Sequence, residues 1–190
     1  VLDYSTLVDM FRTKGILIPD EEVSLTFETT GNITVIYFKE GTFVKQGELL
    51  AKMNDKPLQA ELMKLEAQIP LATDRVARQK SLLERDAVSQ ESYESVVTDL
   101  DKLKADIELV KSRIEQTELR APFDGQMGLR LVSEGSFASL TTVISTLTKI
   151  TSLKIEFSVN ERQAWDVEPG TVLDFTVGNN LLKKYQATVY

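Results

Sequence analysis

The chain has 190 residues, a net charge of −7 at pH 7, and neither cysteine nor histidine. This length is enough for one large or two small domains with a buried core. The missing residue types exclude thiol nucleophiles, disulfides, Cys/His zinc sites and histidine-based triads. The acidic balance argues against nucleic acid as a partner, because phosphate binding needs a basic face.

The aspartates and glutamates lie mostly among lysines and arginines along predicted helices, a pattern typical of a solvated surface. An all-carboxylate metal or acid/base site is the alternative that this composition leaves open, but the pattern favours no enzyme activity, no metal site and no cofactor. No apolar run approaches the ~20 residues of a membrane-spanning helix, and Val1 is not an initiator methionine. We expect the chain to be part of a longer protein whose export signal or anchor lies outside it.

Two periodicities divide the chain. Residues 15–54 alternate apolar and polar in short runs punctuated by glycines, which indicates β-strands. A first helical arm then steps by four and three residues through Leu58, Leu62, Leu65, Ile69, Ala72, Val76, Gln79 and Leu83. A second arm does the same through Tyr93, Val96, Leu100, Leu103, Ile107, Val110, Ile114 and Thr117. This 3.5-residue period predicts a coiled-coil seam.

The two arms are joined by "ERDAVSQES", residues 84–92. This link is too short for parallel helices, so the arms are expected to form an antiparallel hairpin. Asn54 or Asp55 is a candidate N-cap for the first arm and Ser89 for the second. Pro70 removes a backbone hydrogen bond inside the first arm and is expected to bend it.

After the hairpin, β patterning resumes and continues to the end of the chain, with a turn at Pro169-Gly170. We expect the short segment "NERQAWDV" to form one or two helical turns, and Trp165 within it to fill a core rather than stack on a ligand. The predicted divisions are 1–14 (an N-terminal strand), 15–55 and 119–150 (two β halves), 56–118 (the hairpin) and 151–190 (a further β region).

An internal repeat relates the two flanks of the hairpin. Gly31 and Gly41 recur, with the same spacing of ten residues, as Gly125 and Gly135. The second glycine of each pair lies in "EGTF" or "EGSF", and an apolar pair follows eight and nine residues later. We expect the glycines to supply positive φ in shared turns and each phenylalanine to pack beneath its turn. The halves are predicted to form one sandwich.

At this point the sequence resembles a known family. "TGNITVIYFKEGTFVKQGELLAKMND" and "LRAPFDGQMGLRLVSEGSF" are similar to the two half-motifs of the periplasmic adaptors, or membrane fusion proteins, of bacterial tripartite efflux pumps. The resemblance covers residues 15 to about 178. It implies an α+β fold in which a split lipoyl-like β-sandwich carries an inserted α-helical coiled-coil hairpin. Part of a β-barrel domain, to which residues 1–14 could add a strand, would follow.

The resemblance also implies a function. Such adaptors link an inner-membrane transporter, here expected to be of the RND type, to a TolC-like outer-membrane channel. They work as homo-oligomers, trimers or hexamers, in the periplasm, tethered to the inner membrane. An adaptor of an ABC-type exporter is an alternative. A type I secretion adaptor is a third interpretation, but such adaptors tend to have much longer hairpins, so the modest arms of this chain count against it.

The family's channel-binding pattern, Arg-x3-Leu-x6-Ser, matches Arg78, Leu82 and Ser89 at the predicted tip. An exposed arginine could make forked hydrogen bonds to a facing helical tip, and Leu82 could supply an apolar contact. Structural roles are the alternatives: Arg78 could pair with Asp74, Leu82 could widen the seam, and Ser89 could only cap its helix.

Lys56 raises an alternative of another class. The stretch before it resembles half of a small domain that carries lipoyl or biotin on a lysine. A carrier lysine has to sit at an exposed two-residue hairpin apex, whereas Lys56 is followed by Pro57 and a predicted helix. We therefore interpret Lys56 as an ordinary lysine at the point where the hairpin is inserted.

Overall fold

The computed structural model of the chain describes residues 12–161, 165, 167–178 and 184–190. The chain forms two compact units. The larger unit is Glu21–Lys149, and the smaller comprises Val1–Asp20 and Ile150–Tyr190. Strands β1 (Gly15–Leu25) and β8 (Ser145–Phe157) each run through the division between the units.

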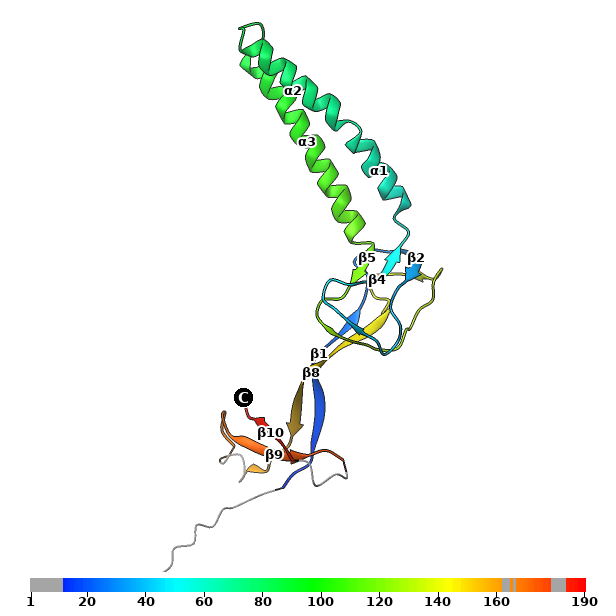
Figure 1. Cartoon of the computed structure of the whole chain (residues 1–190), viewed down its shortest axis with the longest axis vertical. Helices are drawn as coiled ribbons and strands as arrows, with labels where there is room; N and C mark the ends of the chain where they lie inside the picture. The colour runs from blue at the N-terminus through cyan, green and yellow to red at the C-terminus, as the bar shows by residue number, and fades with distance from the viewer. Residues whose placement is uncertain (1–11, 162–164, 166, 179–183) are drawn as a thin grey trace, which may run out of the picture. The chain divides into compact units, whose positions relative to one another are not determined.

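The predicted helical hairpin is confirmed. Helices α1 (Lys56–Glu66) and α2 (Ile69–Leu83) form one arm, and α3 (Gln90–Glu115) returns as the other (Figure 1). Pro70 does more than bend the first arm: the helix stops at Glu66 and a new helix begins at Ile69, with the proline in its first turn. Proline is tolerated there because the first N–H groups of a helix have no partner inside the helix.

The residues predicted for the seam are all buried or half-buried. The eight seam residues of the first arm are half-buried, and every other residue of α1 and α2 is exposed. The second arm carries the buried side chains, namely Leu100, Leu103, Ile107, Val110, Ile114 and Thr117. The hairpin therefore buries one face of each arm against the other.

The β part of the larger unit contains two four-stranded sheets, in the orders β1-β8-β6-β3 and β5-β4-β2-β7. The strands before the hairpin are β2 (Gly31–Ile36), β3 (Phe43–Val44) and β4 (Leu49–Met53). Those after it are β5 (Glu118–Arg120), β6 (Gly125–Met127) and β7 (Phe137–Ala138). Each sheet combines strands from both sides of the hairpin, so neither half can complete a sheet alone.

The repeat extends through the core. Gly31 and Gly125 are 94 positions apart, and buried residues of the first half correspond in sequence, at this same offset, to buried residues of the second half. The seven pairs are Leu25/Leu119, Phe27/Ala121, Ile33/Met127, Val44/Ala138, Leu50/Ile144, Ala51/Ser145 and Met53/Leu147. Ser145 is the one polar member. The two halves therefore contribute equivalent positions to a single core.

Backbone hydrogen bonds cross between the halves in the same paired way. Glu40 Oε1 accepts from the N–H of Arg130 at 2.9 Å, and Glu134 Oε1 accepts from the N–H of Ile36 at 2.9 Å. The main chain repeats this exchange: the N–H of Gly41 donates to Met127, and that of Gly135 donates to Ile33. The glutamate of each Glu-Gly-(Thr/Ser)-Phe turn thus accepts a hydrogen bond from the backbone of the opposite half.

The four repeat glycines have two different roles. Gly41 and Gly135 have φ of 72° and 83°, the left-handed region that glycine adopts without steric cost. The prediction of positive φ is wrong for Gly31 and Gly125, which are the first residues of β2 and β6. At Gly125 the reason for glycine is close approach, because a Cβ there would lie 2.7 Å from the carbonyl oxygen of Thr148.

The prediction that the turn phenylalanines are packed beneath their turns is also wrong. Phe43 and Phe137 are 52% and 67% exposed. Each is followed by the buried residue of its two-residue strand, Val44 or Ala138. Since successive side chains of a strand point to opposite faces, burying the second residue turns the phenylalanine outward.

In the smaller unit, β9 (Val172–Thr176) pairs antiparallel with β10 (Lys184–Thr188), and Phe175 stacks on Tyr185 at 5.4 Å between ring centroids. Trp165 is 83% exposed, so the expectation that it fills a core is wrong. None of this unit's described residues is buried.

Two predictions for the smaller unit lie largely outside the described residues. They are the N-terminal strand within 1–14, of which residues 12–14 are described, and the helical turns of 160–167.

The sandwich is expected to fold without the hairpin. No hairpin residue belongs to its core cluster, and the two chain crossings are adjacent because Met53 N–H donates to Thr117 O at 2.9 Å. Replacing residues 56–115 by a short glycine-rich loop should preserve a cooperative thermal transition followed in the β region of the circular dichroism spectrum. A chain that shows no such transition, or that binds hydrophobic dyes like a molten globule, would contradict this expectation.

Candidate functional site at the hairpin tip

The tip of the hairpin is a defined turn. The N–H of Ala87 donates to Leu82 O and the N–H of Asp86 donates to Leu83 O, both at 2.9 Å. This pair of bonds is the Schellman pattern that ends many helices, with Asp86 at the position usually taken by glycine. Asp86 has φ of 54° and is the one described non-glycine residue with positive φ. The link "ERDAVSQES" therefore reverses the chain through a helix C-cap.

The three predicted tip residues are all exposed. Arg78 lies on α2, and no carboxylate among the described residues forms an ion pair with it, so the pairing with Asp74 is absent there. Leu82 is 40% exposed, whereas its seam neighbour Leu83 is half-buried. Ser89 caps α3, since its hydroxyl accepts from the N–H of Ser92 at 3.2 Å. The structural alternative for Ser89 is therefore present in the molecule.

One polar bond ties the arms together just below the tip. Gln79 Nε2 donates to Ser92 Oγ at 2.7 Å, and both groups are partly buried. Gln79 is the polar member of the first-arm seam, and Ser92 lies in the first turn of α3. A hydrogen bond within an otherwise apolar seam favours one alignment of the two arms, because shifting either arm would leave a partly buried amide without its partner.

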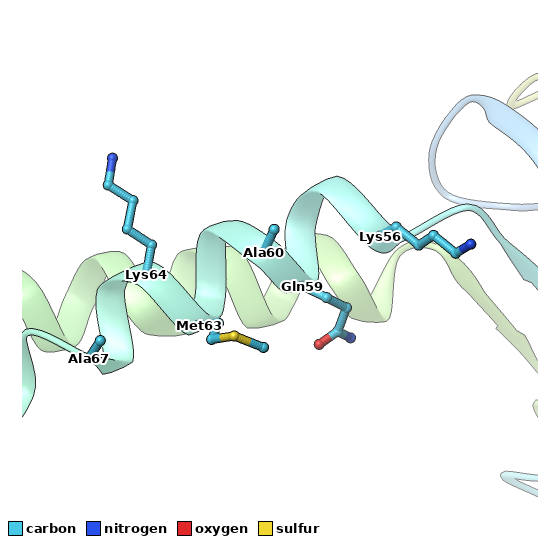
Figure 2. Close-up of a pocket in the computed structure, with 6 residues that line it drawn as sticks. All are labelled: Lys56, Gln59, Ala60, Met63, Lys64 and Ala67. Atoms are coloured by element: carbon cyan, nitrogen blue, oxygen red, sulfur yellow. The ribbon is translucent and has the colours of Figure 1, made fainter.

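At the other end of the hairpin, Lys56 is the first residue of α1, and Asp55 occupies the N-cap position before it. β4 runs into this helix through two residues, so no β-hairpin apex displays the lysine. Figure 2 shows Lys56 on one face of α1, at the end of a shallow hollow. The hollow is lined by Lys56, Gln59, Ala60, Met63, Lys64 and Ala67. All six are exposed, so the hollow is a surface feature and not an enclosed cavity.

A charged cluster lies at the root of the hairpin, the end where its arms join the strands β4 and β5. It was not predicted from the sequence. Lys52 Nζ on β4 lies 2.9 Å from Asp55 Oδ2 and 3.4 Å from Glu118 Oε1 on β5. Arg120 donates to Glu118 Oε2 from Nη2 at 2.6 Å and to Gly47 O from Nη1 at 2.9 Å. The available signal was the opposite charges that flank the hairpin in "KMND" and "TELR".

The protonation of this cluster follows from its contacts. The hydrogen bond to Asp55, helped by the charges of both carboxylates, raises the pKa of Lys52. Partial burial alone would raise the pKa of Asp55, but hydrogen bonds from Lys52 and Gln59 outweigh it and hold that pKa below its usual value. A lowered carboxyl pKa stabilises the fold above the unfolded pKa, and the contribution is lost as pH falls through the folded pKa. The Lys52 contribution is lost only as pH rises through its raised pKa.

Within the described residues, no group of three or more Asp or Glu side chains is arranged to hold a metal ion. The helices that the structure describes are also too short or too polar to cross a membrane.

A family model described as "RND MFP, barrel-sandwich hybrid domain" matches residues 21–149, the span of the larger unit. The chain therefore belongs to this family of RND-type membrane fusion proteins. The barrel-sandwich hybrid in the family's description corresponds to the two interleaved sheets, and the helical hairpin lies between its halves.

Named relatives agree with this family. The chain is 30% identical over 155 residues to multidrug resistance protein MdtA of Pantoea ananatis, with 73% of this chain and 38% of that protein covered. It is 28% identical over 112 residues to the probable efflux pump periplasmic linker protein SepA of Pseudomonas putida, covering 59% and 29%. The chain thus spans less than half the length of either relative.

A solved structure shows the same fold. A chimera of MacA that carries the α-hairpin domain of Pseudomonas aeruginosa MexA matches with a TM-score of 0.80 at 24% identity. The match covers 93% of this chain and 66% of the chimera.

The backbone of Asp86 provides a test of the tip geometry. Replacing Asp86 by glycine should leave the thermal stability unchanged or slightly higher, because glycine adopts positive φ freely. Replacing it by valine should cost about 1–2 kcal/mol, because a β-branched residue strongly disfavours this conformation. Thermal unfolding followed by helical circular dichroism measures both. Equal stability of the two variants would show that the tip does not need positive φ at this position.

Proposed function

We propose that this chain is part of a periplasmic adaptor that links an inner-membrane RND transporter to a TolC-like outer-membrane channel, with the hairpin tip docking on the channel. The observation that carries the proposal is the exposure of Arg78, Leu82 and Ser89 together at the tip of a hairpin inserted into a membrane-fusion-protein sandwich. The Pseudomonas relative is named as a probable efflux pump periplasmic linker protein, which supports the same role.

Each tip residue has a chemistry suited to docking. The Arg78 guanidinium is free to make forked hydrogen bonds to carbonyl or carboxylate groups of a facing helical turn. Leu82 contributes an apolar contact that is already partly accessible. The Ser89 hydroxyl accepts the cap hydrogen bond, so it can offer a partner its remaining O–H donor, and its small size allows the partner to approach closely.

The rest of the proposal concerns architecture. The halves 15–55 and 119–150 form a lipoyl-like domain, the hairpin of 56–118 is a coiled coil, and 151–190 with 1–14 belongs to a β-barrel domain. The adaptor has no chemistry of its own and assembles as a trimer or hexamer. It works in the periplasm while tethered to the inner membrane.

The carrier alternative is not supported. Lys56 lies in the first turn of α1, directly before Pro57, where a modifying enzyme would meet a helix and not a flexible β-turn. The intact mass of the native protein distinguishes the two functions, since lipoylation or biotinylation adds a defined mass.

The first functional prediction concerns Arg78. Replacing Arg78 by aspartate should abolish drug resistance in cells that depend on this protein, because a carboxylate cannot donate the hydrogen bonds and reverses the charge at the tip. Lys102→Asp, the same charge change at an exposed position in the middle of α3, is the matched control and should retain resistance. Expression and circular dichroism should be unchanged in both.

Two results would contradict the docking role. The first is full resistance in the Arg78→Asp variant. The second is equal loss of resistance in both variants, which would indicate a general effect of charge on the hairpin. Co-purification of the outer-membrane channel with each variant separates lost docking from a later defect.

Ser89 requires a pair of variants because it caps α3. Ser89→Ala removes the cap and should lower stability by about 1 kcal/mol. Ser89→Asp keeps a good cap but adds size and charge at the tip. If close approach matters, Ser89→Asp should lose resistance while its melting temperature stays near that of the native protein. Retained resistance in Ser89→Asp would leave Ser89 with capping as its only role.

A further inference from the structure

The chain passes between sandwich and hairpin twice, and the Lys52 ammonium lies beside both crossings. The first crossing leads from β4 through Asp55 into α1, and the second leads from α3 through Thr117 into β5. Lys52 Nζ contacts a carboxylate from each crossing, Asp55 Oδ2 at 2.9 Å and Glu118 Oε1 at 3.4 Å. The side chains of these three residues are between 13% and 26% exposed, so solvent screens the contacts only partly.

The two carboxylates are themselves held from opposite sides. Gln59, one turn into α1, donates to Asp55 Oδ2 at 3.0 Å. Arg120 on β5 holds the other oxygen of Glu118 and also binds the carbonyl of Gly47, in the loop before β4. The network therefore runs without a break from the first turn of α1, through Lys52, to the framework of the sandwich.

Little else connects the helices to the sandwich. α1 and α2 pack against α3, but contacts between the helices and the strands are sparse. α1 has no buried residue. The backbone bonds from Met53 to Thr117 and from Asn54 to Asn32 fix where the chain crosses, but they end before the first helical turn. The other ion pairs described in the hairpin, Lys104–Asp101 and Lys111–Glu108, lie within α3 and do not link the hairpin to the sandwich.

We propose that Lys52 is a positioning residue that restrains the direction in which the hairpin leaves the sandwich, by bridging Asp55 and Glu118. Without this bridge the hairpin would pivot on two short backbone crossings. One consequence rests on the adaptor role proposed above. In that role the restraint would keep the tip aimed at the channel and would transmit any reorientation of the sandwich to the tip.

The test measures the spread of hairpin directions in the isolated protein. The chain has no cysteine, so Ala105→Cys on α3 and Ser133→Cys on the sandwich, both exposed, provide two unique sites for spin labels. Pulsed electron–electron double resonance then gives the distribution of distances between them. Lys52→Met, which keeps the length of the side chain without its charge, should widen this distribution clearly.

Lys111→Met is the matched control. It also removes a lysine from an ion pair, but one confined to α3, and its distance distribution should equal that of the labelled native protein. Asp55→Asn and Glu118→Gln each weaken one side of the bridge and should give intermediate widths. These two variants decide the question if Lys52→Met does not fold.

A second readout is amide exchange at the crossings. In Lys52→Met the amides of Met53 and Asn54 should exchange on the order of tenfold faster, while amides of the sandwich core keep their protection. An unchanged distance distribution in Lys52→Met, or equal widening in Lys111→Met, would overturn the proposal. Because neither channel nor transporter is present, failure of tip docking would leave this result untouched, and the reverse also holds.

Discussion

The mutual completion of the two β halves is the constraint on which the rest of the structure depends. Each sheet draws strands from both halves, and the buried residues come in pairs at one fixed offset, from Leu25/Leu119 to Met53/Leu147. Glu40 and Glu134 extend this exchange to side chain–backbone bonds. The core is formed by contacts between the halves and not by the segment that joins them. A long insertion therefore costs little beyond the entropy of loop closure, which grows only slowly with the length of the insertion.

The same symmetry explains where the chain leaves the sandwich. The hairpin follows Met53 and returns at Leu119, while the chain enters from the smaller unit before Leu25 and leaves toward it after Leu147. These are equivalent positions of the repeat. One framework thus provides two equivalent exits, and different segments occupy them. The sequences at the exits differ accordingly: the hairpin exit has the Lys52 bridge, whereas Lys149 pairs with Glu21 at the other.

Features that depend on local periodicity could be predicted from the sequence. Features that depend on which segment a strand pairs with could not. The seam was predictable because a 3.5-residue spacing determines which face of each arm is inward. The outward phenylalanines were not, since a two-residue strand acquires its faces only from its neighbour: Phe43 pairs opposite Gln126 and Phe137 opposite Asn32. The Lys52 bridge was missed for the same reason, because its two carboxylates are brought together only when β4 and β5 pair. Asp86 gave a weak local signal, as aspartate tolerates positive φ better than most residues.

Rigidity at the two ends of the hairpin has different physical origins. At the tip, Asp86, the Ser89 cap and the Gln79–Ser92 bond fix a turn whose outer side chains remain available. At the root, direction depends on charged hydrogen bonds, because the helices make few contacts with the strands of the sandwich. Polar contacts restrain angle strongly but have short range, so a few ångströms of displacement would release them. A hairpin attached in this way is stiff for small forces and free to pivot once the bridge opens.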